Sequence, residues 1–151
     1  MTVTGKAGSG KSTLVNTLVT AIRRKFGRDD VVCVLGPTGC AAHNINGKTI
    51  HAGFKIQAKV PTYHPSVNGL KICKKRYGRL LVLIINERTM TEAEILACLE
   101  NYAKYSVHQG MNTDTEWGGI SIVILLGDDG QLPAIKNSCF CLLYTSDAAD
   151  E

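Results

Sequence analysis

Three predominantly apolar runs, with amphipathic segments between them, limit what this 151-residue chain can fold into. They are Val31–Leu35, Leu80–Ile85 and Ile120–Leu126, and a shorter strand-like stub at Val3-Thr4 precedes them. Strands that are apolar along their whole length are buried on both faces, as in parallel sheets covered by helices. The sequence therefore predicts an α/β domain with a mainly parallel sheet between two layers of helices.

Two amphipathic helices are predicted to cover this sheet. Lys11–Phe26 repeats its apolar residues with a helical period. A second helix is predicted to open at Thr91, because Thr91 and Glu94 have the spacing of a capping box. Gly53–Arg79 is less regular and contains prolines and glycines, so it is predicted to be an insertion or a surface excursion.

Composition narrows the class of protein. Hydrophobic residues make up 44% and charged residues 20% of the chain, which excludes a disordered chain and a coiled coil. The apolar runs are far shorter than the ~20 residues of a membrane helix, so no membrane partner is expected. The formal net charge of +4 suits a polyanionic partner. The six cysteines lack regular spacing, which favours free thiols in a reducing, intracellular compartment.

A glycine-rich loop joins the first strand stub to the first helix. Residues 5–12 read Gly-Lys-Ala-Gly-Ser-Gly-Lys-Ser and fit the phosphate-binding pattern Gly-x4-Gly-Lys-Ser. Glycines let consecutive backbone N–H groups point into one concavity, and the helix N-terminus adds partial positive charge. The lysine can reach β- and γ-phosphate oxygens, and the serine hydroxyl is placed for Mg²⁺. The predicted phosphate-binding residues are Gly5, Ala7, Gly8, Ser9, Gly10, Lys11, Ser12 and Thr13.

This loop does not by itself choose among kinases, transporters, GTPases and motors. The sequence has no guanine-reading Asn-Lys-x-Asp motif, which argues against a GTPase, and no arginine-rich lid after the third strand, which argues against a small-molecule kinase. The choice depends on the segments that follow the other strands, because ligands gather at the carboxyl ends of parallel strands.

Three segments at these strand ends, behind the phosphate loop and in this order, resemble the first RecA-like domain of Pif1-type DNA helicases of superfamily 1. They are Gly36–His51, Asn86–Met90 and Gly127–Pro133. The resemblance implies a three-layer RecA-like P-loop NTPase domain over residues 1–140, truncated at its N-terminus. Residues 141–151 differ in composition and resemble peptides translated from sequencing-adapter DNA, so they are predicted to be a non-native tail.

The resemblance also implies roles for individual residues. Glu87 matches the carboxylate that orients or deprotonates the attacking water, and Gln131 matches the amide that senses the γ-phosphate. Both join Lys11 as expected catalytic residues. Single-stranded DNA is expected along Pro37, Thr38, Gly39, Thr49 and His51. A basic cluster before the third strand either helps to hold DNA or is a solvated patch; it consists of Lys71, Lys74, Lys75, Arg76 and Arg79.

The sequence departs from the family's pattern at Asn86, where such helicases have an aspartate. That aspartate holds Mg²⁺ directly or through water, and a neutral amide is a poorer ligand for this hard cation. The expected metal ligands are therefore Ser12 and Glu87, with Asn86 as a weakened third. This substitution predicts impaired metal-dependent hydrolysis with nucleotide binding retained, because Lys11 and the loop amides remain.

The resemblance implies an ATP- and Mg²⁺-binding motor domain of a 5′→3′ DNA helicase that acts in DNA repair, recombination and telomere maintenance. In a eukaryote its place would be the nucleus or the mitochondrion. The expected partners are single-stranded DNA, duplex junctions and a second RecA-like domain of the same parent chain, which supplies the arginine finger. Two alternatives stay open: a catalytically impaired helicase fragment that binds nucleotide or single-stranded DNA without turnover, and another P-loop NTPase or kinase.

Overall fold

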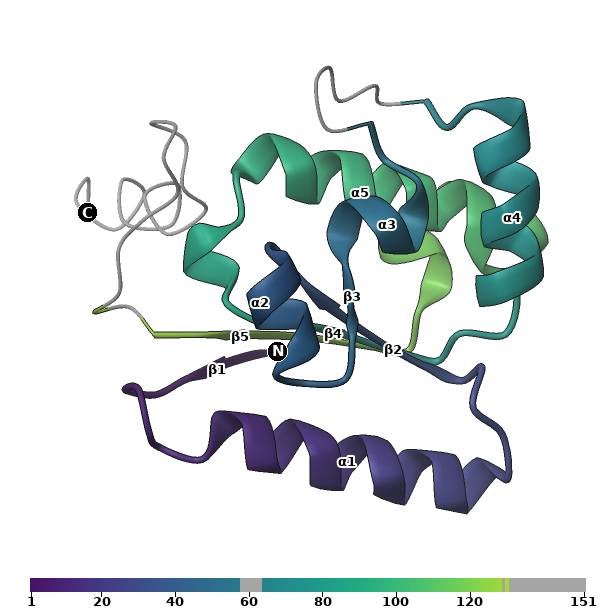
Figure 1. Cartoon of the computed structure of the whole chain (residues 1–151). Helices are drawn as coiled ribbons and strands as arrows, with labels where there is room; N and C mark the ends of the chain where they lie inside the picture. The colour runs from purple at the N-terminus through teal and green to yellow at the C-terminus, as the bar shows by residue number, and fades with distance from the viewer. Residues whose placement is uncertain (58–63, 129, 131–151) are drawn as a thin grey trace, which may run out of the picture.

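The computed structural model describes residues 1–57, 64–128 and 130, and in this part of the chain five parallel strands form one sheet (Figure 1). The order across the sheet is β1-β5-β4-β2-β3. The strands are β1 (Thr2–Thr4), β2 (Val32–Gly36), β3 (Lys48–Thr49), β4 (Val82–Ile85) and β5 (Ile122–Gly127). The predicted α/β class with a mainly parallel sheet is confirmed.

The helices lie on both faces of the sheet and give three layers (Figure 1). Helix α1 (Lys11–Phe26) has the bounds predicted from its apolar period and covers one face. Helices α3 (Ile50–Phe54), α4 (Val67–Tyr77) and α5 (Ala93–Ser106) lie on the other face. Short elements complete the described fold: α2 (Gly39–His43) and the 3₁₀ turns η1 (Arg88–Met90), η2 (Val107–Gly110) and η3 (Glu116–Gly119).

Alternate side chains of the central strands enter two separate apolar cores. In β4, Leu83 and Ile85 belong to the core beneath α3, α4 and α5, whereas Val82 and Ile84 belong to the core beneath α1. Both sets are buried, which explains why this strand has no polar residue in alternation. The sheet thus packs against helices on both faces, and its polar site residues lie where the strands end.

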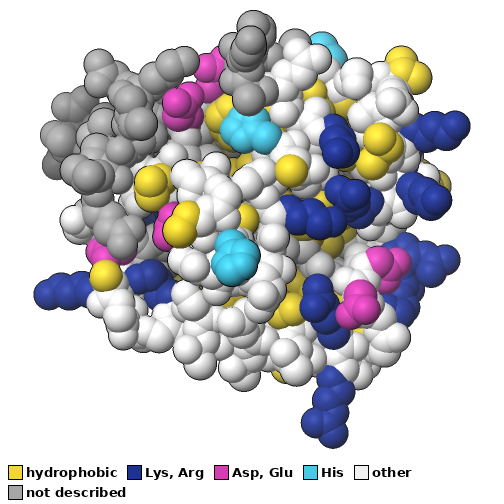
Figure 2. Space-filling view, in the orientation of Figure 1, with side chains coloured by type: hydrophobic (Ala, Val, Ile, Leu, Met, Phe, Trp, Pro, Cys, Tyr) yellow, Lys and Arg dark blue, Asp and Glu magenta, His cyan; other side chains and the backbone are white. Residues whose placement is uncertain are grey.

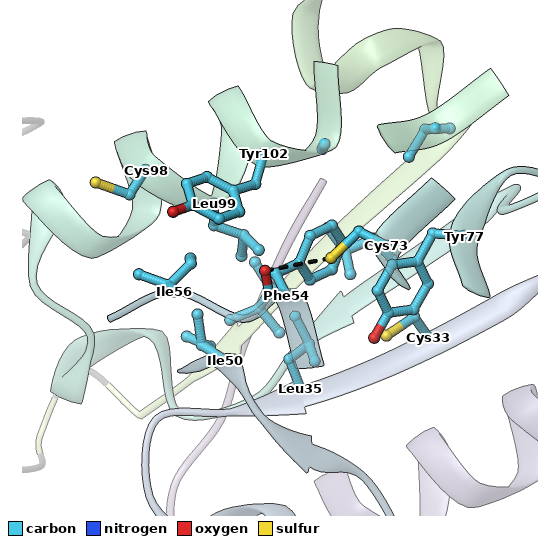
Figure 3. Packing of buried hydrophobic residues seen from close by; sticks show 14 of the residues in the cluster. Cys33, Leu35, Ile50, Phe54, Ile56, Cys73, Tyr77, Cys98, Leu99 and Tyr102 are labelled. Atoms are coloured by element: carbon cyan, nitrogen blue, oxygen red, sulfur yellow. Dashed lines mark hydrogen bonds between the residues drawn. The ribbon is translucent and has the colours of Figure 1, made fainter. Parts of the chain in front are cut away.

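The segment Gly53–Arg79 differs from its prediction as an insertion or surface excursion. It contributes to the larger core: the rings of Phe54 and Tyr77 stack with centroids 4.3 Å apart. The buried Cys73 thiol donates to the Phe54 carbonyl at 3.3 Å (Figure 3). The prediction was wrong because glycines and prolines interrupt the helical period around the two short helices.

The predicted capping box is also wrong. Helix α5 begins at Ala93, and the residue at its N-cap, Glu92, makes no side-chain capping hydrogen bond. Thr91 instead closes the preceding 3₁₀ turn, and its hydroxyl donates to the Glu87 carbonyl at 3.5 Å. The prediction failed because the 3₁₀ turn that connects β4 to α5 ends at Thr91, so α5 begins two residues later.

Smaller differences concern the strand ends and the two-residue strand β3, which sequence periodicity did not predict. β4 and β5 each begin two residues later than predicted. β2 and β5 each include the glycine that follows the predicted apolar run.

The predicted tail at 141–151 lies outside the described residues. Within the described part, Cys33, Cys40, Cys73 and Cys98 are free thiols. The described helices include none with the length and apolar character to cross a membrane.

Candidate nucleotide site and DNA-facing edge

The phosphate loop, residues 5–12, connects β1 to α1 at the carboxyl ends of the strands (Figure 1). The Gly5 N–H donates to the carbonyl of Gly127 at 3.2 Å, which fixes the start of the loop to the end of β5. Gly8 and Gly10 have φ values of +78° and +85°, a left-handed conformation that glycine adopts without strain. The glycine pattern is therefore a backbone requirement of this loop.

The Lys11 ammonium lies over the loop. Its Nζ donates to the carbonyl oxygens of Gly5 and Lys6, the latter at 2.9 Å, and the residue is half-buried. Ser12 follows it in the first turn of α1 and is exposed. An ammonium held over backbone carbonyls can exchange them for anionic phosphate oxygens, which are stronger acceptors.

A cavity of about 390 Å³ brings the loop together with the ends of β4 and β5. Three of the predicted phosphate-binding residues, Gly5, Ser9 and Thr13, do not line this cavity. Gly5 instead anchors the loop through its backbone N–H. The cavity is lined by Ala7, Gly8, Gly10, Lys11, Ser12, Asn86, Glu87, Gly127 and Asp128.

Asn86 and Glu87 reach this cavity from the end of β4. Asn86 is 6% exposed, so its amide is a buried wall of the cavity. Glu87 is half-buried and has φ 55° and ψ 50°, a left-handed conformation that is uncommon for a residue with a side chain. Such strain costs of order 1–3 kcal/mol and clusters at functional sites, where the surrounding structure holds it.

Asp128 is a site residue that the sequence-based prediction did not single out. It is 9% exposed, lines the same cavity, and accepts a 3.0 Å hydrogen bond from the Gly130 N–H on Oδ1. A usable signal was present, because Asp128 follows β5 closely as Glu87 follows β4, and these strands are neighbours. The two carboxylates therefore meet at one cavity.

The described residues contain no group of three or more His, Cys, Asp or Glu side chains that could hold a metal ion. The cavity does present hard oxygen donors: the Ser12 hydroxyl and the carboxylates of Glu87 and Asp128. Mg²⁺ prefers such ligands and commonly completes its shell with water and substrate phosphates. These residues thus fit Mg²⁺ bound together with a nucleotide. The predicted sensor Gln131 lies outside the described residues.

Arg88 packs across the backbone at the end of β5. A Cβ atom added to Gly127 would lie 2.8 Å from the Arg88 Cγ and 3.2 Å from its Nε. The absence of a side chain at Gly127 therefore allows η1 to approach β5 closely. Since Gly127 also accepts the Gly5 N–H, it connects the phosphate loop to the turn that carries Glu87.

The predicted DNA-contact hydroxyls cap two short helices. The Thr38 Oγ1 accepts from the Ala41 N–H at 3.2 Å at the start of α2, and the Thr49 Oγ1 accepts from the Ala52 N–H at 3.1 Å at the start of α3. Each hydroxyl keeps its own proton, because capping uses only an oxygen lone pair. Each can therefore still donate to a phosphate oxygen.

The structure brings these two caps to neighbouring strand ends. Gly36, the last residue of β2, pairs with Thr49, the last residue of β3. Pro37 and Gly39 flank the Thr38 cap, and His51 is half-buried in α3. All five predicted DNA-contact residues thus lie along the β2–β3 edge, beside the nucleotide cavity at β1, β5 and β4.

Burial shifts two titratable groups behind this edge. It raises the pKa of the Cys33 thiol to about 11 and raises the pKa of the Tyr77 phenol. The Tyr77 hydroxyl donates to the Gly53 carbonyl at 3.0 Å. Both groups stay neutral at physiological pH, so they support the core rather than act as nucleophiles.

A phosphate loop after β1, with a carboxylate after β4 in the same parallel sheet, is the arrangement of a P-loop NTPase domain. The model of the PIF1-like helicase family matches residues 1–140. The chain belongs to the PIF1-like helicase family. This membership argues against the alternative of another P-loop NTPase or kinase.

Curated relatives are similar over most of this chain. The ATP-dependent DNA helicase PIF1 of Candida albicans is 36% identical over 135 residues, which cover 87% of this chain and 14% of the relative. The protein of that name from Emericella nidulans is 33% identical, covering 87% and 18%. The ATP-dependent DNA helicase RRM3 of Saccharomyces cerevisiae is 32% identical, with the same coverage. The chain thus spans less than a fifth of these relatives.

Solved structures agree with this assignment. The crystal structure of Pif1 helicase from Candida albicans has a TM-score of 0.70 at 33% identity, over 90% of this chain and 30% of that one. Bacteroides Pif1 bound to single-stranded DNA has a TM-score of 0.66 at 29% identity, over 100% and 33%. The three-layer RecA-like architecture is therefore confirmed.

Proposed function

We propose that this chain is the ATP-binding motor domain of a DNA helicase that moves 5′→3′ along single-stranded DNA. The observation that carries the proposal is one cavity in which Lys11 and Ser12 of the phosphate loop meet Glu87 and Asp128 at two neighbouring strand ends. The relatives are named ATP-dependent DNA helicases, which supports ATP as the nucleotide. In the parent chain, a second RecA-like domain would close on this site and supply the arginine finger.

Each residue of the cavity has a role in this proposal. The loop N–H groups and the α1 N-terminus bind the phosphates, and Lys11 leaves the Gly5 and Lys6 carbonyls to contact the β- and γ-phosphate oxygens. Glu87 orients the attacking water and accepts its proton. Ser12, with the cavity carboxylates nearby, would hold Mg²⁺, which when bound would neutralise charge on the phosphates.

DNA would lie along the β2–β3 edge. The Thr38 and Thr49 hydroxyls donate to phosphate oxygens, the glycine beside Thr38 lets the backbone approach, and the His51 imidazole stacks on a base or donates to it. Solved structures similar to this chain include Pif1 bound to single-stranded DNA and Pif1 helicases described as unwinding DNA at forked double-stranded DNA, which supports strands and junctions as partners. Repair, recombination and telomere maintenance are the processes proposed for the parent helicase.

A second candidate function is favoured by Asn86. Its buried amide stands at the cavity wall where such helicases have a carboxylate. An amide binds Mg²⁺ more weakly, so this chain would bind nucleotide and single-stranded DNA with little or no turnover. The two candidates share the nucleotide site and differ in hydrolysis alone.

Nucleotide binding by the folded chain tests the shared part. A fluorescent ATP analogue is titrated with Mg²⁺ against the unchanged chain, Lys11→Ala and Lys25→Ala, which removes the same charge from the far end of α1. Removing a charge-assisted hydrogen bond predicts an affinity loss of about tenfold or more for Lys11→Ala only. Equal affinities for all three chains, or no binding by correctly folded protein, would overturn the proposal.

A further inference from the structure

Positive charge is concentrated in one third of the chain. Residues 31–86 contain no aspartate or glutamate and hold eight of the 17 lysines and arginines. All 13 acidic residues lie in the remainder, where they outnumber the other basic residues. The excess positive charge of this protein therefore comes entirely from the segment that forms β2, α2, β3, α3, α4 and β4.

The fold gathers part of this charge into one basic surface, which we define as Lys48, Lys55, Lys71, Lys75 and Arg76. Figure 2 shows Lys and Arg side chains over the side of the molecule where α3 and α4 lie in Figure 1. None of the ion pairs between described residues includes a member of this set. Among the described residues, no carboxylate therefore lies within ion-pair distance of this surface.

Contacts fix the basic surface to the β2–β3 edge, where DNA is proposed to bind. The Arg76 Nη1 donates to the Gly53 carbonyl in α3 at 3.3 Å, and its guanidinium lies 5.9 Å from the centre of the Tyr77 ring. Lys48 directly precedes the Thr49 cap, and a Cβ on Gly53 would lie 4.0 Å from the Lys48 Cβ. The surface thus begins beside the α3 cap.

Two further contacts extend it onto α4. A Cβ on Gly69 would lie 3.5 Å from the Lys55 Cβ, so Lys55 stands at the junction of α3 and α4. Lys71 and Lys75 are exposed and one helical turn apart on α4. The basic surface therefore continues from the α3 cap along α4.

Folding explains only part of this arrangement. Basic residues in the last turn of α4 favour the helix dipole, which accounts for Lys75 and Arg76. Lys71 lies in the middle of the helix, and like charges four residues apart destabilise a helix slightly. Lys48 and Lys55 belong to no long helix. Asp29 and Asp30 line a pocket together with Lys48 and Arg76, whereas the two exposed lysines of α4 repel each other, and such uncompensated charge is suited to a polyanion.

We propose that the basic surface is a second contact for the DNA phosphate backbone, which continues the DNA path from the Thr49 cap across α4. The inference rests on the proposed function, since it extends the same DNA-binding edge. Lysines bind phosphates as point charges without reading bases, so this surface would add affinity and salt dependence but no sequence preference.

The test measures the salt dependence of DNA binding by the 151-residue chain. Fluorescence anisotropy gives the affinity for a 30-nucleotide oligonucleotide at several salt concentrations, for the unchanged chain and Lys71→Ala/Lys75→Ala. Each lost contact to single-stranded DNA lowers the slope of log affinity against log salt by about 0.7, so the double variant should lose about 1.4. Circular dichroism checks that both chains are folded.

A matched variant controls for net charge. Arg24→Ala/Lys25→Ala removes two charges from α1, on the opposite face of the sheet (Figure 1), and should leave the slope unchanged. Lys48→Ala/Lys55→Ala tests continuity and should lower the slope as the α4 variant does. A forked substrate with a duplex arm is measured in parallel. Equal slope losses on both substrates place the single strand on α4, and a loss larger by about 0.2 per contact on the fork places the duplex there.

Several results would overturn the inference. An unchanged slope for the α4 variant, or an equal loss in the α1 control, would show that the basic surface makes no specific contact with DNA. If the α4 variant binds DNA normally while Thr49→Ala weakens binding, the inference fails and the proposed function stands. If the folded, unchanged chain binds no DNA at any salt concentration, both fail.

Discussion

The backbone N–H of Asn86 donates to the carbonyl of Leu35 at 2.8 Å, which joins the end of β4 to the end of β2. Asn86 and Glu87 line the nucleotide cavity. The chain after Leu35 passes through Gly36 and Pro37 to the Thr38 cap. The candidate nucleotide site and the candidate DNA-binding edge at the ends of β2 and β3 are therefore connected through adjacent strands of one sheet.

This connection predicts that nucleotide and single-stranded DNA change each other's affinity. Binding at Glu87 shifts a backbone that is bonded to β2, and coupling between two binding sites is reciprocal. The expected factor is about fivefold or more in each direction. Titration of a labelled oligonucleotide with and without a non-hydrolysable ATP analogue gives one factor, and the converse titration gives the other. Independence of the two affinities would contradict coupling through the sheet.

The parts of this fold that follow long patterns could be predicted from the sequence. Helix α1 has a regular apolar period over 16 residues, and its predicted bounds match the structure. The three apolar runs each became a strand, with ends shifted by one or two residues. Such patterns can be recognised in a sequence because burial of one helix face, or of both faces of a sheet, requires apolar residues at regular positions.

The parts that depend on tertiary contacts could not be predicted in this way. β3 has two residues, too few for any period. The burial of Tyr77 depends on stacking with Phe54, 23 positions earlier in the chain, and the sequence around Tyr77 does not indicate this contact. Asp128 joins the cavity only because β5 lies beside β4. The candidate site is therefore completed by residues from neighbouring strands of the sheet that are far apart in the chain.

Asp128 is predicted to support Mg²⁺ binding together with the nucleotide. With an amide at Asn86, the Asp128 carboxylate is one of two that face Ser12 across the cavity. Asp128→Asn keeps the volume but removes the charge, and should reduce the gain in ATP affinity on adding Mg²⁺ by about tenfold. Calorimetry with and without Mg²⁺ measures this gain.

Asn86→Asp is the converse variant. It should increase the Mg²⁺-dependent gain and raise ATP turnover, because an aspartate is a better ligand for a hard cation. The control for Asp128→Asn is Asp114→Asn, which removes a carboxylate that does not line the cavity. If Asp128→Asn and the control retain the same Mg²⁺ response, Asp128 has no part in cation binding.

Gly127→Ala is predicted to disturb the junction of η1, β5 and the phosphate loop. The new methyl group would meet Arg88 Cγ at 2.8 Å, so Arg88 must move. Overpacking of this kind costs about 1–3 kcal/mol of unfolding free energy. Urea denaturation of Gly127→Ala, Arg88→Ala and the double variant measures the coupling. The double variant should be less destabilised than the sum of the single variants, and simple additivity would exclude the proposed clash.

Stability is predicted to fall in alkaline solution because of the buried Cys33 thiol. Burial raises its pKa from 9.0 in the reference state to about 11 in the folded protein. Between these values the unfolded chain releases the proton and the folded chain keeps it, so the unfolded state is favoured as pH rises. The free energy of unfolding should therefore be unaffected by this group below about pH 9. Above that, it should decrease by up to about 1.4 kcal/mol per pH unit.

Urea denaturation from pH 8 to pH 10.5 measures this decrease. Cys33→Ala should have a lower stability at pH 8, because it leaves a small cavity in the core, but a shallower fall with rising pH. Cys40→Ala is the matched control, since Cys40 is an exposed thiol and its removal should keep the full alkaline slope. The buried Cys73 and Tyr77 also have raised pKa values, so some slope remains in both variants. Equal slopes for the Cys33 and Cys40 variants would show that the Cys33 thiol is not the group that titrates.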